Sequence, residues 1–367
     1  MDKTRLSKFV SILASNQLDA YVLNPGPSFR YLTSLNFHLM ERPIILIITP
    51  NNLPTIILPK FECDRLEDSI TDFNIISYGD NPADWQQAFS EAAIILQING
   101  ANIGLEPSRL RVLELDFLKS ALPDAIFISS PGVLETLRTI KSSTEIASMR
   151  KAVEIAQAAF MAVLPFVKIG VTERVLASEI IIQLLRAGSD TEFPFFPIVA
   201  SGPNSANPHS EPGNRAIRKG DLVVIDWGAG YNGYFSDLTR TLLIGIPSEK
   251  DTLISELVIK ANLAAINAAR PGMAAGNVDR AAREIITSAG YGGYFTHRTG
   301  HGLGLEAHEP PYIYSENNQP LEVGNTHSIE PGIYIPGYGG VRIEDDVVIT
   351  THGAESLSNL SRDLWVI

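Results

Sequence analysis

The stretch 222–244, "LVVIDWGAGYNGYFSDLTRTLLI", contains the pattern that most strongly predicts the fold of this chain. The dipeptide "NG" at 232–233 is a strong signal for a two-residue type I′ turn between antiparallel strands. With that turn, Asp226 is expected to pair with Thr239. Because side chains alternate between the faces of a strand, Asp226 and Asp237 should be diagonal neighbours on one face, about 7–8 Å apart at Cα.

A second stretch, 328–350 ("SIEPGIYIPGYGGVRIEDDVVIT"), repeats this arrangement of acidic residues. It places Glu330 and Glu344 on two strands joined by a Gly-rich turn, and Arg342 shares a face with Glu344 by the same alternation. Carboxylates held together on an apolar sheet repel each other unless a cation lies between them. The two stretches can therefore bring four carboxylates to one cation site.

An internal repeat connects the two stretches. Residues 168–188 resemble 270–290, with glycines at equivalent places, and each copy is expected to be a helix that starts and ends at a glycine. Residues 219–228 resemble 323–332 at a similar offset. The repeat predicts two related helix–helix–strand halves around a pseudo-two-fold axis, with a site on that axis that receives equivalent residues from both.

The stretch 297–311, "HRTGHGLGLEAHEPP", contains three of the seven histidines of the chain. Four carboxylates and one or two imidazoles form a hard, oxygen-rich site for two divalent ions, closer to manganese or cobalt than to a structural zinc site. Two such ions can hold a bridging hydroxide, which is a nucleophile for amide hydrolysis at neutral pH. Gly300 and Gly302 are expected to let the chain pass close to the ions.

Composition narrows the class of protein. The formal net charge of −12 argues against nucleic-acid and anionic-membrane partners, which favour basic surfaces. Cys63 is the single cysteine, so an intrachain disulfide cannot form and a reducing compartment is expected. The first residues have the helical spacing of an amphipathic helix, and the apolar runs are too short to span a bilayer. We therefore expect a cytoplasmic protein.

The first third of the chain alternates short apolar strands with helical segments, which predicts a small α/β domain. Ser142 and Glu145 have the spacing of a capping box that opens a long helix. We therefore expect two domains, residues 1–135 and 136–367.

Together these motifs resemble those of the pita-bread metallopeptidases of the Xaa-Pro branch, the prolidases and aminopeptidases P. The resemblance rests on "DWGAGYNGYFSDLTRT", "HRTGHGLGLEAHEPP", "SIEPGIY" and "GGVRIEDDVVIT". It covers residues 140–367 closely and extends more weakly to "NPGPSFRYLTSLNF" near the N-terminus. It implies an α/β (α+β) fold, in which a creatinase-like N-terminal α/β domain precedes a pita-bread catalytic domain.

The resemblance also implies roles for individual residues. The metal ligands would be Asp226, Asp237, His301, Glu330 and Glu344, holding two divalent ions, manganese first and cobalt or zinc as alternatives. A metal-bridging hydroxide would attack the scissile carbonyl. Glu330, His209 and His308 would handle protons or stabilise the intermediate, and His297 and Arg342 would contact the substrate. Small peptides with proline in second position would be the substrates, and the protein would be a homodimer.

Several readings stay open at this point. Hydrolysis of the Xaa-Pro bond by an Xaa-Pro dipeptidase, which releases the N-terminal residue, is preferred to an aminopeptidase P acting on longer peptides. A metal-free creatinase-like hydrolase and a non-catalytic binding module are remote alternatives, because both have lost the carboxylate ligands. The segment "GNTHSIEPG" departs from the family pattern at Asn325 and His327. By alternation from Glu330, His327 is expected to point away from the site.

Overall fold

The computed structural model describes residues 1–367, with the side chains of all residues except 67–70. The chain divides into two compact units, Met1–Arg138 and Thr139–Ile367. Helix α5 (Glu135–Thr139) contains both this division and the boundary expected from the sequence.

The first unit is built on a six-stranded mixed sheet with the order β4-β3-β2-β1-β5-β6. Strands β1 and β2 pair antiparallel, as do β2 and β3, and the remaining pairs are parallel. The strands are β1 (Ala20–Leu23), β2 (Ile45–Ile48), β3 (Thr55–Pro59), β4 (Asn74–Tyr78), β5 (Asn102–Leu105) and β6 (Ile126–Ser129). The helices are α1 (Lys3–Ser15), α2 (Pro27–Thr33), α3 (Trp85–Leu96) and α4 (Val112–Ala121). This confirms the small α/β domain expected from the sequence.

The second unit contains two larger sheets, with the orders β19-β11-β8-β7 and β13-β12-β14-β17-β18. Its helices are α6 (Ser143–Val163), α7 (Glu173–Arg186), α8 (Glu249–Ala268) and α9 (Ala275–Ser288). Its strands are β7 (Ile198–Ser201), β8 (Leu222–Trp227), β9 (Gly230–Tyr231), β10 (Tyr234–Phe235), β11 (Leu238–Leu243), β12 (Gly300–Gly302), β13 (Glu309–Ile313), β14 (Thr326–Ile329), β15 (Gly332–Ile335), β16 (Gly339–Arg342), β17 (Asp345–Thr350), β18 (Gly353–Ser356) and β19 (Trp365–Val366).

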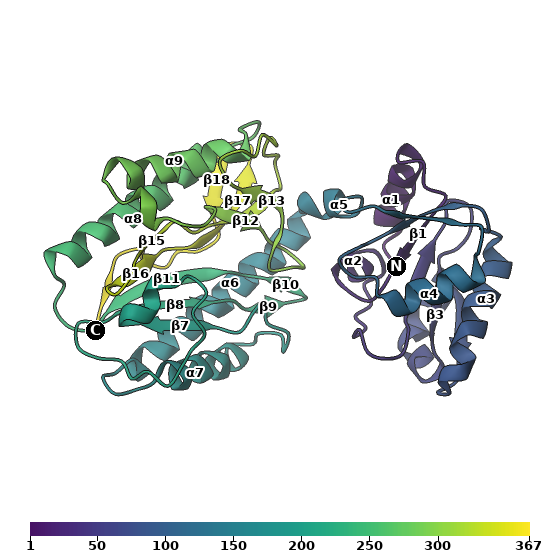
Figure 1. Cartoon of the computed structure of the whole chain (residues 1–367), viewed down its shortest axis with the longest axis horizontal. Helices are drawn as coiled ribbons and strands as arrows, with labels where there is room; N and C mark the ends of the chain where they lie inside the picture. Colours follow the sequence, from purple (N-terminus) through teal and green to yellow (C-terminus); the bar gives the residue numbers. More distant parts are fainter. The chain divides into compact units, whose positions relative to one another are not determined.

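The two halves of this unit follow the internal repeat. Within the second unit, α6 and α7 lie on one side of the strands and α8 and α9 on the other (Figure 1). Helices α7 and α9 end in the same way, with Gly188 and Gly290 in the left-handed region at φ of 97° and 85°. In both, the next amide donates to the carbonyl five residues earlier, which is a Schellman motif. The C-terminal glycines were therefore predicted correctly.

The N-terminal ends of the repeated helices differ from the prediction. Helix α7 begins at Glu173 and is capped by the Thr172 side chain, and the corresponding cap of α9 is Ala274. Gly170 and Gly272 precede these caps, and their left-handed φ angles form the turn that leads into each helix. In both copies the glycine lies two residues before the cap, so it serves the approach to the helix rather than its first turn.

The helices explain two further features of the sequence. Helix α6 opens with the expected capping box, because the Ser142 amide donates to Glu145 Oε2 at 2.8 Å and Ser142 Oγ accepts from the Glu145 amide. Helix α1 buries Phe9 and Leu13 on its apolar face, as its spacing predicts. Among the described residues, no helix is long and apolar enough to cross a bilayer.

Candidate metal centre

The first two acidic residues are placed by the β8–β11 hairpin. Thr239 pairs with Asp226, and Asn232 and Gly233 both have positive φ, 53° and 79°, as a type I′ turn requires. The predicted register is therefore confirmed. Asp237 directly precedes β11, one position from the Leu238–Trp227 pair, so its carboxylate lies beside that of Asp226.

The second half of the repeat supplies the other carboxylates. Glu330 directly follows β14, and Glu344 lies in the short link between β16 and β17. An isolated bridge between Thr239 and Glu344 joins the two halves of the repeat at this point. Thr239 Oγ1 also donates to Glu344 Oε2 at 2.7 Å, which holds the carboxylate toward Asp226.

His301 lies at the centre of β12, between β13 and β14. The flanking glycines have a packing role that the sequence did not predict. A Cβ at Gly300 would clash with the Ser328 carbonyl, and one at Gly302 with the Pro310 carbonyl. These glycines therefore let β12 approach its two neighbouring strands, and the close approach to the site belongs to the His301 side chain.

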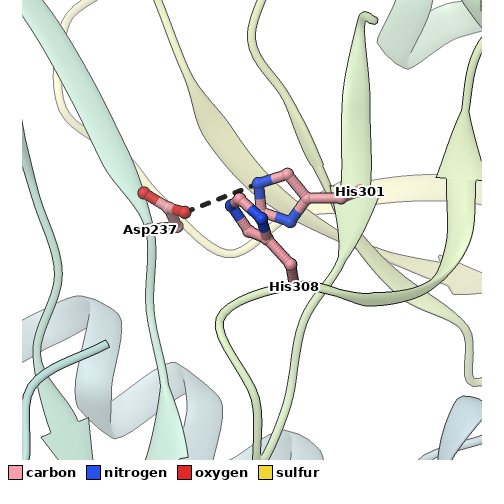
Figure 2. Close-up of side chains that lie close together, drawn as sticks. All are labelled: Asp237, His301 and His308. Atoms are coloured by element: carbon pink, nitrogen blue, oxygen red, sulfur yellow. Dashed lines mark ion pairs between the residues drawn. The ribbon is translucent and has the colours of Figure 1, made fainter. Parts of the chain in front are cut away.

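These side chains come together in three overlapping groups whose ligand atoms lie within 4.8 Å of one another. The groups are Asp226, Asp237 and Glu344; His301, Glu330 and Glu344; and Asp237, His301 and His308. Figure 2 shows the last of these, with His301 directed toward Asp237 and the His308 ring beside it. All five residues expected as metal ligands are thus gathered at one place, with His308 next to them.

The electrostatics of the cluster favour cations. Asp226 Oδ1 and Asp237 Oδ1 are buried and, within the part of the chain that the structure describes, have no hydrogen-bond partner. Burial, followed by the charges of Glu344 and Asp226, raises the pKa of Asp237 well above its ordinary value. Burial also raises the pKa of Glu330 to about 7. Carboxylates this costly to ionise fit divalent cations, which would satisfy the free oxygens and offset the repulsion.

The tautomer of His301 suits a ligand. Its Nδ1 lies 3.1 Å from the Gly302 carbonyl, which can only accept, so Nδ1 carries the proton. Nε2 then presents a lone pair at 3.4 Å from Glu330 Oε1 and 3.7 Å from Asp237 Oδ2. Burial and the neighbouring His308 charge hold the pKa of His301 well below its ordinary value. A neutral imidazole fixed by a backbone carbonyl is the usual form of a metal-binding histidine.

A hydrogen-bonded chain leads away from Asp226. Arg342 Nη2 donates to Asp226 Oδ2 at 2.5 Å, and Arg342 Nη1 donates to the Tyr334 hydroxyl at 3.2 Å. Tyr334 lies 2.8 Å from His297 Nε2 and donates to it, because His297 Nδ1 donates to the Arg298 carbonyl. The predicted substrate residues His297 and Arg342 are therefore linked through a tyrosine that sequence reasoning missed.

The other two predicted histidines flank the cluster. The His308 ring centroid lies 3.8 Å from that of His301. His209 is exposed in the loop after β7, and its charge acts on the pKa of Asp226 and of His308, so it faces the same group.

His327 lies outside the three groups, in agreement with the prediction from strand alternation. It pairs with Gly302 and Val347 and is fully buried, and burial lowers its pKa to about 3.

Two polar contacts of the site were not predicted, namely those of Thr239 and of Asp346. The Asp237 amide donates to Asp346 Oδ2 at 2.8 Å. The predicted pairing of Thr239 with Asp226 could have indicated the Thr239 contact, because it places Thr239 next to the acidic residues.

Comparison with known proteins agrees with this geometry. Residues 147–351 match the model of metallopeptidase family M24, and residues 5–140 match the creatinase/prolidase N-terminal domain. The chain is 36% identical to an Xaa-Pro dipeptidase of Lactobacillus delbrueckii subsp. lactis, over 99% of this chain and 98% of the relative.

Solved structures give the same result. A dipeptidase from Pyrococcus horikoshii OT3 superposes with a TM-score of 0.92 at 39% identity, covering 99% of this chain and 100% of that one. An X-Pro aminopeptidase from Thermotoga maritima MSB8 superposes with a TM-score of 0.86 at 30% identity, covering 99% and 100%. The chain therefore belongs to metallopeptidase family M24 and is a peptidase with a creatinase/prolidase-type N-terminal domain.

Proposed function

We propose that this peptidase is an Xaa-Pro dipeptidase that hydrolyses the bond before proline with two divalent ions. The observation that carries this proposal is the convergence of four carboxylates on one neutral imidazole, with two carboxylate oxygens left without a hydrogen-bond partner among the described residues. The full-length similarity to an Xaa-Pro dipeptidase supports the substrate class.

The proposed ligands are Asp226, Asp237, His301, Glu330 and Glu344. Asp237, His301 and Glu344 each belong to two of the three groups, so the cluster has room for more than one ion. The donor set is mostly carboxylate oxygen, which favours manganese, with cobalt or zinc as alternatives. Two ions bound here would polarise the scissile carbonyl and activate water as the nucleophile.

The protein's own groups would move the protons. Glu330 Oε1 accepts from Ser328 Oγ at 3.3 Å and lies 3.4 Å from His301 Nε2. This carboxylate is therefore held beside the proposed metal ligand His301. We assign it the transfer of a proton from the attacking water toward the leaving nitrogen. His308 and His209 flank the same place and can each donate a hydrogen bond to the intermediate or a proton to the proline nitrogen.

The substrate side of the proposal rests on an aromatic group. The His297 ring lies 5.3 Å from the Phe295 ring and 5.3 Å from the Tyr334 ring. An Xaa-Pro amide has no N–H to donate, so a site must recognise the proline ring by shape, and a cluster of ring faces suits this. His297 is thus proposed to contact the proline ring of the substrate. Arg342 is proposed to hold Tyr334 and Asp226 in place beside it.

The competing readings differ in testable features. An aminopeptidase P would use the same metal cluster on longer peptides, and the similarity to an X-Pro aminopeptidase keeps it as the second candidate. A metal-free creatinase-like hydrolase and a non-catalytic binding module both require a loss of carboxylates, whereas all four are present and converge.

The test is hydrolysis by full-length protein stripped of metal and refilled with manganese, cobalt or zinc. Ala-Pro, Ala-Pro-Ala and Ala-Ala are compared by release of the first amino acid, and bound metal is measured in parallel. We expect about two ions per chain, cleavage of Ala-Pro, and little cleavage of Ala-Ala. Protein that binds two ions and leaves every proline peptide intact would contradict the proposal. Preference for Ala-Pro-Ala would favour aminopeptidase P.

Two further properties are proposed without a direct structural observation. The single cysteine, Cys63, suits a reducing compartment, which supports a cytoplasmic location. Homodimerisation is proposed from the family resemblance, and sedimentation of the purified protein would test it.

A further inference from the structure

Arg342 is the arginine that the family resemblance implies as a substrate contact. Its side chain is 3% exposed, and its guanidinium is already committed to the protein. It donates to Thr239 Oγ1 (3.0 Å), the Pro208 carbonyl (3.2 Å), the Tyr334 hydroxyl (3.2 Å) and Asp226 Oδ2 (2.5 Å). Four of the five donors of an arginine are therefore used, and Arg342 has little capacity left for an anionic group of a ligand.

Arg298 is in the opposite situation. Its guanidinium carbon lies 4.6 Å from the centroid of the Tyr312 ring, and the side chain is half-buried. In the described part of the chain this guanidinium makes no hydrogen bond or ion pair. Arg283, on the neighbouring helix α9, shows the usual arrangement, because it pairs with both oxygens of Asp279. A half-buried guanidinium with no anion beside it is a ready site for an anionic ligand.

The position of Arg298 connects it to the cluster. It directly follows His297, whose Nδ1 donates to the Arg298 carbonyl at 2.7 Å. Tyr312, which supports the guanidinium, lies on β13, four residues after His308. The charge of Arg298 also acts on Glu330, where it lowers the pKa, and on His308. The guanidinium is thus held near His308, in the segment that leads from His297 into β12.

We propose that Arg298 receives the C-terminal carboxylate of an Xaa-Pro dipeptide. This inference rests on the proposed function and deepens it, since it names the group that distinguishes a dipeptide from a longer peptide. In Xaa-Pro the carboxylate belongs to the proline itself, next to the scissile bond. A planar guanidinium can bind both of its oxygens, and the Tyr312 ring beneath the Arg298 guanidinium supports it in place.

The charge of the site favours a cation at this position. A substrate carboxylate that enters beside four protein carboxylates is repelled by any negative charge that the ions leave uncompensated. Arg298 offsets this repulsion on the proline side. Each residue added after proline moves the terminal carboxylate away from Arg298, so the same contact would disfavour tripeptides.

The experiment compares Ala-Pro with Ala-Pro amide on manganese-loaded, full-length protein. The amide has the same shape and lacks the negative charge. We expect the wild-type protein to prefer Ala-Pro, and Arg298→Gln to reduce the ratio of the two kcat/KM values by about 10- to 100-fold, the range for loss of a charge-assisted hydrogen-bonded pair. Arg298→Lys keeps the charge without the planar pair of donors and should fall in between. Arg186→Gln, an exposed arginine at the end of α7, is the matched control.

The outcomes distinguish a failure of the role proposed for Arg298 from a failure of the proposed dipeptidase function. A wild-type protein that cleaves both substrates equally well would overturn the role of Arg298 and leave the proposed function standing. The same holds if Arg298→Gln slows both substrates by one factor, because the effect would then lie in the fold. A protein that cleaves neither substrate contradicts the proposed function itself. The wild-type preference needs no variant, so it remains informative even if a substitution impairs folding.

Discussion

Glu344 and Asp345 are adjacent in the chain, and the structure treats their charges in opposite ways. Asp345 is fully buried, and its two oxygens accept from Arg240 Nη2 at 2.8 Å and Arg362 Nε at 2.7 Å. Glu344 accepts from a threonine hydroxyl and faces two other carboxylates, and burial followed by those charges raises its pKa well above the ordinary value. One carboxylate is neutralised by the chain, and its neighbour is left for a ligand to neutralise.

The difference arises from the alternation of side chains at the start of β17. Neighbouring residues point to opposite faces, so Asp345 meets the arginines on one side and Glu344 meets the acidic cluster on the other. A buried charge without a partner destabilises a protein, and it persists where a ligand or function compensates for it. The comparison therefore separates structural charge pairs from the candidate metal centre, and the following predictions test it.

The largest effect is expected at Asp237, which belongs to two of the three ligand groups. Asp237→Ala should lower kcat/KM for Ala-Pro by about 1000-fold or more and remove at least one bound ion, because the activated water depends on the metal pair. Activity assays and metal analysis of the purified variant measure both. Asp346→Asn, which can keep the contact with the Asp237 amide, is the control expected to retain both ions. Full activity with two ions in Asp237→Ala would refute the ligand assignment.

A change at Asp345 should act on stability rather than on metal. Asp345→Asn leaves Arg240 buried beside a neutral group, and breaking such a pair costs about 3–5 kcal/mol of the free energy of unfolding. Denaturant unfolding measures this value. Glu355→Gln on the adjacent strand β18 breaks an exposed pair with Arg150 and should cost less than about 1 kcal/mol. Similar losses of unfolding free energy in the two variants would show that the buried Asp345 pair contributes no more to stability than an exposed pair.

A smaller effect is expected from Glu330 in protein kept metal-free with a chelator. Its pKa in the folded state is about 7, above the ordinary value of 4.5. A raised carboxyl pKa contributes stability that is complete below 4.5 and is lost as pH rises through about 7. Glu330→Gln cannot ionise and avoids this loss. The free energy of unfolding of the variant should therefore rise relative to that of the wild type between pH 5 and pH 8, by at most about 3 kcal/mol.

Urea unfolding of both proteins across this pH range is the measurement. Parallel pH profiles would show that Glu330 titrates normally in the folded protein. Adding manganese to the wild type should abolish most of the difference at pH 8, because the ion compensates the carboxylate.

The smallest effect is expected in the hairpin that brings Asp226 and Asp237 together. Gly233 has φ of 79°, so Gly233→Ala should cost about 1 kcal/mol of unfolding free energy, with both ions retained. Gly293→Ala, at an exposed glycine with open space around it, should change stability by less than about 0.5 kcal/mol. Loss of metal in Gly233→Ala would mean that the turn also sets the geometry of the site.

The success of the sequence-based predictions depended on how local each signal was. The hairpin register was predictable because two residues of a type I′ turn determine it. The internal repeat then indicated that the second half supplies acidic residues equivalent to Asp226 and Asp237. The packing role of Gly300 and Gly302 was not predicted, since their spacing shows that the backbone needs room and does not show which neighbour takes it. The carbonyls of Ser328 and Pro310, on the two strands that flank β12, occupy that space.

The sequence by itself determined the two-domain α/β organisation, the hairpin and the acidic and histidine residues that converge. These follow from periodicity, turn chemistry and repetition, which act over short distances along the chain. Only the tertiary structure decided which charges are compensated. Arg342 is committed to Asp226 and Tyr334, whereas Arg298 is stacked on Tyr312 without an anion. The physical reason is that the energy of a charge depends on its neighbours in space, and strand pairing selects those neighbours from segments more than a hundred residues apart.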